Sequence, residues 1–302
     1  MPEVPTLEGH RARVRAVNAG SLWLDGGAMF GVVPKPLWAR RAPPDERNRI
    51  PLAMRCLLVE TDSATVLVDT GLGNKESEKF RDIYGVENEG APTRLEDSLA
   101  DLGVGPPDVD VVISTHLHFD HAGGNTVMDD AGRILPSFPN ARYAVRRGEY
   151  EFARTDNERI RASYIDRNFQ PLVDAGRVDF FDDDAEPVPG IGLLHTPGHT
   201  PHHQSVWIDL GAERVLFLAD LVPTRAHLPL AWVMGYDIEP LVTLQSKKAT
   251  LGRAAAEGWW LAFEHDPFVA WGRTEEDDEK RNPWRLADEV EHVLVRSAER
   301  GS

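Results

Sequence analysis

Four potential metal ligands lie within six consecutive residues and form the most informative feature of this sequence. They are His116, His118, Asp120 and His121, and they follow an apolar run at residues 109–114 that is typical of a buried strand. Side chains two positions apart in an extended segment point to the same side, so His116 and His118 can bind one ion together. Asp120 and His121 come where the strand ends, and they can face a second ion. Imidazole nitrogen and carboxylate oxygen suit zinc, iron or manganese.

Three further segments each place a metal-ligand candidate at the end of an apolar run. His199 lies in a Thr-Pro-Gly-His turn, Asp220 ends the run that begins at Val215, and His265 follows a run of aromatic and aliphatic residues. A lone carboxylate at the end of a buried strand is costly unless it is paired or bound to metal. We therefore expect these three side chains to join the first four at one end of a layered sheet structure.

Taken in order, these residues resemble the signature of the metallo-β-lactamase-fold hydrolase superfamily. That signature runs His-x-His-x-Asp-His, then a His in a Thr-Pro-Gly-His turn, then an Asp and a last His, and the Asp69-Thr70-Gly71 turn also matches. The resemblance covers about residues 20 to 270 and implies an α+β fold, the four-layer αβ/βα sandwich. It implies that His116, His118 and His199 bind a first metal, that Asp120, His121 and His265 bind a second, and that Asp220 bridges both.

The chemistry implied by the resemblance is hydrolysis at two divalent ions, with zinc favoured and iron, manganese or cobalt as alternatives. Two ions about 3.5–4 Å apart can hold a hydroxide and polarise a carbonyl or phosphoryl oxygen. Metal binding lowers the pKa of water to about 7, so no serine or cysteine nucleophile is required. We expect Asp120 to carry the proton as the leaving group departs. Asp69 either orients a ligand histidine or only forms a turn.

The substrate must be inferred from segments outside the ligand set, because the superfamily performs many hydrolyses on one scaffold. Residues 29–38 resemble the N-terminal arm of the quorum-quenching lactonase and organophosphate-hydrolase branch. Apolar residues at 228–234 either line an acyl or aryl pocket or pack into the core. We predict a lactonase that opens acyl-homoserine or related lactones, with phosphotriester, phosphodiester or thioester hydrolysis as the alternative. The residues expected to contact the substrate are Met29, Phe30, Phe119, His227 and Trp232.

One segment departs from the lactonase pattern. Many acyl-homoserine lactonases carry a tyrosine a few residues after the bridging aspartate, aimed at the substrate carbonyl, and residues 221–227 contain none. We consider His227 as a hydrogen-bond donor in its place. His202 and His203 lie just past His199 and are interpreted as structural or as support behind the ligands, because seven ligands already complete two coordination spheres.

Composition favours a cytoplasmic enzyme that acts on a small molecule. The chain has 302 residues and a formal net charge of −16, which argues against a nucleic-acid partner because phosphate binding requires Lys and Arg. A local basic patch at residues 35–49 is the exception. The single cysteine, Cys56, lies in an apolar run and is interpreted as a buried thiol. We see no signal peptide or membrane-spanning run, so we expect no membrane partner, and we leave a homodimer open.

We expect one domain over residues 1–302, with its core at about 20–270. Residues 52–60 and 65–69 are predicted to be paired strands, and a helix is predicted from the Thr93 capping box to about Gly103. Further predicted helices are 239–257, a largely helical charged segment at 146–169, and a terminal helix at 282–300. Alternating strand and helix patterns in both halves fit the sandwich.

Other classes of protein are disfavoured by specific residues. A non-catalytic metal-binding scaffold would be expected to lack one or more of the ligands. A nuclease would need a basic arm, and a glutathione thioesterase a basic C-terminal patch where this chain is acidic at 275–279. A flavodiiron oxidoreductase carries Glu where this chain has His118.

Overall fold

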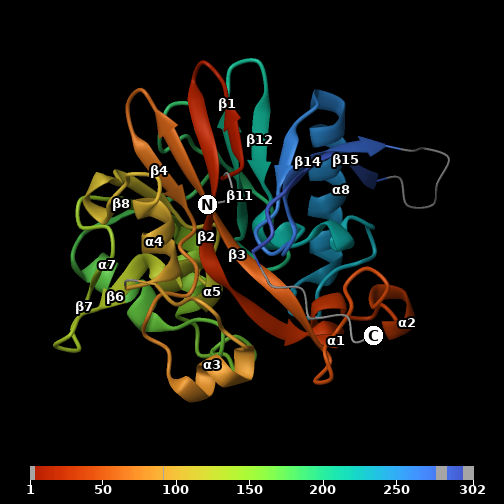
Figure 1. Ribbon diagram of the computed structural model, residues 1–302, viewed down its shortest axis with the longest axis horizontal. Coiled ribbons are helices and arrows are strands. Elements are labelled where there is room, and N and C mark those ends of the chain that lie inside the picture. The colour runs from red at the N-terminus through yellow and green to blue at the C-terminus, as the bar shows by residue number, and fades with distance from the viewer. Residues whose placement is uncertain (1–3, 91, 277–283, 295–302) are drawn as a thin grey trace.

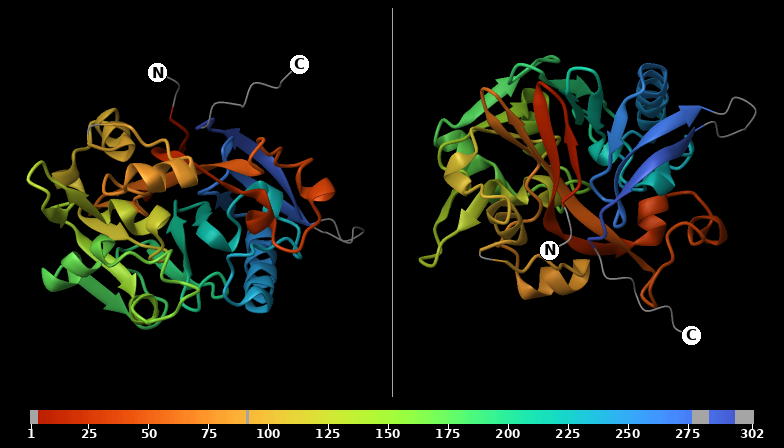
Figure 2. Two further views of the ribbon diagram at one scale, coloured as in Figure 1. Left: turned by 90° about the horizontal axis from the view of Figure 1, so that it is seen from below. Right: turned by 45° about the horizontal axis from the view of Figure 1, so that its top comes forward.

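Two β-sheets face each other, with helices on their outer faces (Figure 1; Figure 2). The computed structural model describes residues 4–90, 92–276 and 284–294. Within these residues the first sheet has the strand order β1-β2-β3-β4-β5-β8-β9 and the second the order β10-β11-β12-β13-β14-β15, while β6 pairs with β7. The result is the four-layer sandwich expected from the sequence.

The bounds of the elements are as follows. The first sheet and the small pair contain β1 (Thr6–Glu8), β2 (Ala12–Asp25), β3 (Arg49–Thr61), β4 (Thr65–Val68), β5 (Val111–Ile113), β6 (Thr126–Met128), β7 (Ile134–Pro136), β8 (Arg142–Arg146) and β9 (Val178–Phe181). The second sheet contains β10 (Ile191–His195), β11 (Gln204–Asp209), β12 (Arg214–Phe217), β13 (Trp260–Ala262), β14 (Val269–Glu276) and β15 (Trp284–Glu291). The α-helices are α1 (Gly26–Phe30), α2 (Lys35–Trp38), α3 (Glu78–Tyr84), α4 (Arg94–Ala100), α5 (Phe119–Ala122), α6 (Arg147–Ala153), α7 (Gln170–Asp174) and α8 (Pro240–Glu257). The short 3₁₀ helices are η1 (Pro106–Asp108), η2 (Gly123–Asn125), η3 (Asp166–Asn168), η4 (Ala219–Leu221) and η5 (Arg225–His227).

Parallel strand pairs explain why the metal-ligand candidates meet. In the first sheet β4 pairs with β5 in parallel, and in the second β12 pairs with β13 in parallel. Parallel neighbours end at the same edge of a sheet. The turn at Asp69 and the His116 motif therefore leave the first sheet together, and Asp220 and His265 leave the second sheet together.

Apolar side chains from both sheets fill the space between them. Leu57 and Val66 of the first sheet belong to one buried cluster with Ile208 and Phe217 of the second. Each of these side chains is fully buried, and removing such a side chain from water contributes about 1.5–3 kcal/mol. This shared core fixes how the two sheets, and hence their ligand-bearing edges, face each other.

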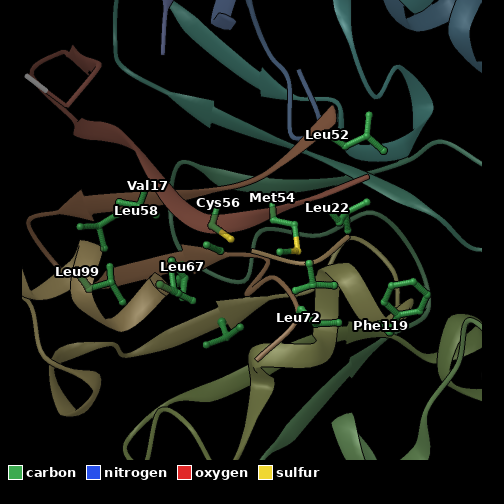
Figure 3. Packing of buried hydrophobic residues seen from close by; sticks show 14 of the residues in the cluster. Val17, Leu22, Leu52, Met54, Cys56, Leu58, Leu67, Leu72, Leu99 and Phe119 are labelled. Carbon is green, nitrogen blue, oxygen red and sulfur yellow. The ribbon is translucent and has the colours of Figure 1, made fainter. Parts of the chain in front are cut away.

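The outer face of the first sheet is covered by a second apolar cluster (Figure 3). Leu99 of α4 packs there with Leu58 and Leu67 of the sheet, and Phe119 of the motif loop belongs to the same cluster. Cys56 is also part of it and is fully buried, which confirms the interpretation of a core thiol. Burial raises the pKa of that thiol well above its ordinary value.

Several predicted elements are confirmed. Strands β3 and β4 pair antiparallel where paired strands were expected. Helix α4 begins after Thr93, whose hydroxyl accepts a hydrogen bond from the Glu96 backbone N–H at 3.3 Å. Helix α8 occupies the predicted range and ends at Gly258, which has a φ of 66°. Among the described residues, no helix is both long enough and apolar enough to cross a membrane.

Two predicted helices are wrong in the described residues. The terminal helix at 282–300 is instead strand β15, which pairs antiparallel with β14, and residues 282–283 and 295–300 lie outside the described residues. Trp284 and Leu286, two positions apart, pack into the cluster against α8, which suits a strand. The segment 146–169 is helical only in α6 and η3, and the chain between them packs Ile160 and Tyr164 into a buried cluster beside the motif loop.

Candidate metal centre

The motif loop reaches the site through a sharp, tightly packed turn. After β5 the chain bends at Thr115, passes through His116 and His118, and then forms the single helical turn α5, which carries Asp120 and His121. Gly123 follows, and a Cβ placed there would lie 2.2 Å from the carbonyl oxygen of Leu72. Only glycine allows this approach of the two backbones, so the Gly-Gly pair is a packing requirement of the loop.

A first group of ligand atoms comes from three histidines and one aspartate. His116, His118, His199 and Asp220 are buried, and one ligand atom from each lies within 4.8 Å of the others. Nε2 of His199 is 3.1 Å from Nδ1 of His118 and 3.0 Å from Oδ2 of Asp220. Nε2 of His116 lies 3.8 Å from the same carboxylate oxygen.

A second group lies beside the first and contains Asp120, His121 and His265, again within 4.8 Å of one another. Nε2 of His265 is 3.2 Å from Nε2 of His121. It is also 3.1 Å from Oδ1 of Asp220. Oδ2 of Asp220, which faces the first group, is also 3.5 Å from Nε2 of His121. The Asp220 carboxylate therefore lies between the two groups and contacts both.

The chemistry of these donors fits divalent metal ions. Nε2 of His116 and Oδ1 of Asp220 are buried and form no hydrogen bond within the described part of the chain. Buried polar atoms normally have a partner, and such orphans require an explanation. Two pairs of ring nitrogens, one between His118 and His199 and one between His121 and His265, face each other beside Asp220. Each pair can share one proton at most. A cation in each group would satisfy the converging lone pairs, as zinc does with imidazole and carboxylate ligands.

Most of the clustered histidines are held through their second ring nitrogen, as metal-binding histidines usually are. Those contacts join His116 Nδ1 to Thr115 Oγ1 at 3.1 Å, His121 Nδ1 to Asp69 Oδ2 at 3.1 Å, His199 Nδ1 to Asp237 Oδ1 at 3.0 Å and His265 Nδ1 to the Ala53 carbonyl at 2.7 Å. The alternatives for Asp69 are both present, because it has a left-handed φ of 55° and also orients His121. Its carboxylate additionally accepts hydrogen bonds from the backbone N–H and the hydroxyl of Thr115, each at 2.7 Å.

Charge inside the cluster controls where protons reside without metal. Burial alone would lower the pKa of His199, but Asp220 and Asp237 outweigh it and raise that pKa to about 10. For His265 burial is likewise outweighed by Asp220, and its pKa rises to about 9. The pKa of His116 is instead held well below its ordinary value by burial and by the neighbouring imidazoles. Metal binding to this cluster would therefore displace protons.

Some residues of the site could not be recognised from the sequence. Asp237 and Glu264 are both buried beside clustered histidines, and Glu264 Oε2 lies 2.9 Å from Nδ1 of His121. Burial raises the pKa of Glu264 to about 8. Asp69, His121 and Glu264 also form a metal-capable group, but both carboxylates approach the same Nδ1, so we interpret them as support for His121. The only sequence signal for Glu264 was its place before His265.

A pocket opens over the two groups. Its lining residues are Leu24, Met29, Leu52, Tyr84, His118, Phe119, Asp120, Arg159, Ile160, Ser163, His199, Asp220, Met234, Gly235, Tyr236, Ile238 and His265. The lining combines apolar side chains with polar ones, and the clustered histidines and aspartates are among the polar ones. Met29 and Phe119 line it, as expected from the sequence.

Three other residues expected at the substrate are placed elsewhere. Phe30 is fully buried and stacks on His227 with ring centroids 4.4 Å apart, and the edge of Trp232 packs on Phe30 at 5.7 Å. None of the three lines the pocket. They form an aromatic cluster behind Met29, because the apolar loop after Asp220 packs into the core.

The expectation that His227 donates to a substrate is corrected by its contacts. Nε2 of His227 donates to the Met29 carbonyl at 2.9 Å, and Nδ1 accepts from the Thr224 hydroxyl at 2.8 Å. Burial lowers the pKa of His227 to about 3, so the ring is neutral. No ring hydrogen remains for a ligand.

Two tyrosines that the sequence did not single out do line the pocket. Tyr84 comes from α3, with its ring 5.1 Å from that of Phe119, and Tyr236 comes from the segment before α8. Neither tyrosine lies within the few residues after Asp220 where lactonases carry theirs, so their spacing in the sequence did not indicate a role. His203, by contrast, is buried and bonded to the Thr196 hydroxyl at 2.9 Å, in agreement with a structural role.

Comparison with known proteins agrees with this geometry. Residues 51–265 match the model of the metallo-beta-lactamase superfamily. The chain belongs to that superfamily. It is 35% identical over 227 residues to an N-acyl homoserine lactonase from a Bacillus species, covering 71% of this chain and 82% of the relative. Membership makes the protein a metal-dependent hydrolase and accounts for the order of the clustered ligands.

Solved structures of superfamily members resemble the whole molecule. A probable metal-dependent hydrolase from Staphylococcus aureus has a TM-score of 0.83 and 32% identity, covering 94% of this chain and 100% of that one. An N-acyl homoserine lactone hydrolase with the product N-hexanoyl-L-homoserine bound at its catalytic metal centre has a TM-score of 0.63 and 26% identity, covering 86% of this chain and 94% of that one. The superfamily resemblance inferred from the motifs is thereby confirmed.

Proposed function

We propose that this protein is a dinuclear metal-dependent lactonase that opens acyl-homoserine or related lactones. The observation that carries the proposal is the placement of Asp220 between two buried ligand groups at a pocket that also has apolar walls. The relatives named as N-acyl homoserine lactonases support the choice of substrate. We further propose that both ions are zinc, for which the nitrogen and oxygen donors are suited.

In this proposal the ions, once bound, polarise the lactone carbonyl and lower the pKa of the attacking water. His116, His118 and His199 would hold one ion, and His121, His265 and Asp120 would hold the other. Asp220 lies where it would serve both groups. Asp120 lines the pocket as well, so its carboxylate can accept the proton of the water and return it to the leaving alkoxide.

The rest of the pocket suits an acyl chain. Apolar side chains such as Met29, Ile160 and Met234 line it, and they can bury a hydrocarbon chain. The hydroxyls of Tyr84 and Tyr236 are the candidates for donating a hydrogen bond to a substrate carbonyl, in place of the tyrosine missing after Asp220.

Thioester, phosphodiester and phosphotriester hydrolysis remains the alternative on the same metal site. An anionic phosphodiester is disfavoured because Arg159 is the one basic side chain, histidines aside, among the described residues that line the pocket. The proposed small-molecule substrate, the cytoplasmic location and a homodimer all remain predictions.

Two measurements test the proposal. Elemental analysis of purified protein should find two zinc ions per chain after zinc is supplied. The metal-loaded enzyme should then hydrolyse an acyl-homoserine lactone faster than a thioester, a diaryl phosphodiester or an aryl phosphotriester. Absence of lactone turnover alongside good turnover of one of the others would overturn the lactonase assignment.

A further inference from the structure

A buried carboxylate outside the ligand set lies between the two chain segments that supply the histidines of the first metal group. Glu149 comes from α6 and is only 1% exposed. It belongs to the segment 146–169, which the sequence predicts to be charged and largely helical. The described structure turns this one carboxylate inward, while Glu151 on the same helix stays exposed.

Glu149 accepts three hydrogen bonds from three separate parts of the chain. Its Oε1 accepts from the backbone N–H of Leu117 at 3.1 Å and from the Tyr164 hydroxyl at 2.7 Å. Its Oε2 accepts from the Thr200 hydroxyl at 2.7 Å. A buried carboxylate is costly unless such donors compensate it, and three donors from fixed positions give it one orientation.

The three donors are next to the ligands of one metal group. Leu117 lies between His116 and His118 in the sequence, and Thr200 follows His199. Tyr164 contacts His118 directly, with ring centroids 4.7 Å apart and a backbone bridge between the two residues. The second group has no comparable contact with Glu149 among the described residues.

We propose that Glu149 is a positioning residue that fixes the His199 turn against the His116–His118 segment and so sets the geometry of the first metal site. The proposal rests on the proposed metal function of that site. His118 and His199 come from segments 81 residues apart. Their ring nitrogens repel each other or compete for protons and so cannot hold the two segments together. Glu149 bonds to both segments, through the Leu117 N–H and the Thr200 hydroxyl. An apolar residue at 149 would fill the space but leave the Leu117 N–H without a partner.

The test compares zinc retention by Glu149→Gln, Glu149→Ala and the exposed control Glu151→Gln. Each purified, zinc-loaded protein is titrated with a zinc chelator of known affinity, and bound zinc is counted at each step. Loss of such supporting contacts typically weakens metal affinity by about 10–100-fold. We expect Glu149→Gln to weaken one of two zinc ions by about tenfold and Glu149→Ala to weaken it more, with Glu151→Gln unchanged. Excess zinc should restore lactone turnover to Glu149→Gln.

A double-mutant cycle separates positioning from simple loss of stability. Thr200→Val removes one donor without changing side-chain size. If both residues act through one link, Thr200→Val should also weaken a single zinc ion, and the double variant with Glu149→Gln should lose less than the two losses added together. Cobalt absorption spectra of the same proteins should change for one cobalt equivalent only.

The result that would overturn the role of Glu149 differs from the result that would overturn the proposed metal function. Folded Glu149→Gln and Thr200→Val proteins that hold zinc as tightly as the wild type, even with lower melting temperatures, would overturn the positioning role. If Glu149→Ala does not fold, these two near-isosteric variants still decide the matter. Wild-type protein that binds no zinc would instead overturn the proposed function and the inference together.

Discussion

The carboxylate of Asp237 accepts a hydrogen bond from Nδ1 of His199 at 3.0 Å, and the other nitrogen of that ring faces His118 at 3.1 Å. Asp237 is 3% exposed and lies just before α8. The pair holds a hydrogen on Nδ1 of His199, so an ion that displaces the second proton of the ring would find the Nε2 lone pair directed at it.

Removing this support should weaken metal binding. We expect Asp237→Ala to lower zinc affinity about 10–100-fold, whereas Asp237→Asn, which keeps an acceptor oxygen, should lose less. Chelator titration of both variants measures the effect. The exposed Glu239 provides the control, since Glu239→Ala changes a nearby charge without touching His199. Zinc affinity in Asp237→Ala equal to that of the control would rule out the supporting role.

The ligand candidates could be found from the sequence because they obey local rules. His116 and His118 have the spacing of one strand face, and Asp220 and His265 follow short apolar strands whose ends meet at one sheet edge. Asp237, Glu149 and Tyr236 obey no such rule. They reach the site only because segments 146–169 and 228–239 fold over it, and that arrangement depends on tertiary packing.

Two errors have the same origin. His227 was expected to face substrate because of its nearness to Asp220 in sequence, but its ring packs on Phe30 and is fully buried. The terminal helix predicted at 282–300 is contradicted by strand β15, whose pairing with β14 includes register shifts. In both cases a long-range partner decided the outcome, and a single sequence does not reveal it.

The two aspartates of the cluster should differ in their effects. Asp220→Ala should reduce the binding of both ions, because its carboxylate contacts both groups. Asp120→Asn keeps a ligand oxygen but loses the proton acceptor, so kcat should fall by more than the metal content does. Metal content and kcat measured on the same samples test both statements. Unchanged turnover in Asp120→Asn would exclude its role in proton transfer.

Chain-length preference should depend on Met234 rather than on Trp232. Met234 lines the pocket, whereas Trp232 packs on Phe30 and under the Arg41 guanidinium, 4.6 Å from its ring. We expect Met234→Ala to raise KM more for long-chain than for short-chain lactones. The difference in binding free energy should be at most about 1–3 kcal/mol for each methylene group that loses its contact. Trp232→Ala should lower stability by about 1–3 kcal/mol and change KM evenly. A length-dependent effect in Trp232→Ala alone would place the acyl chain elsewhere.

The buried His227 should make the fold sensitive to acid. Burial holds its pKa at about 3 in the folded chain, against an ordinary 6.5. The unfolded chain therefore binds a proton below pH 6.5 that the folded chain does not bind until about pH 3, so stability falls as pH falls through this window. One such proton corresponds to about 1.4 kcal/mol per pH unit.

Substitution isolates this contribution. His227→Gln can still donate to the Met29 carbonyl and accept from Thr224 but does not titrate. Urea unfolding at pH 6 and pH 4 should show a smaller loss of stability for His227→Gln than for wild type, by up to about 1.4 kcal/mol per pH unit. Parallel pH profiles for the two proteins would mean that His227 is not the neutral buried group described above.

The most direct test of the proposed dinuclear lactonase follows ring opening as zinc is returned to metal-free protein. The acid released from an acyl-homoserine lactone is titrated while zinc is added stepwise to a known amount of chain. We predict that the rate of ring opening rises with zinc and reaches its plateau at two equivalents per chain. A plateau at one equivalent would contradict the dinuclear site, and no ring opening at any zinc content would contradict the lactonase function itself.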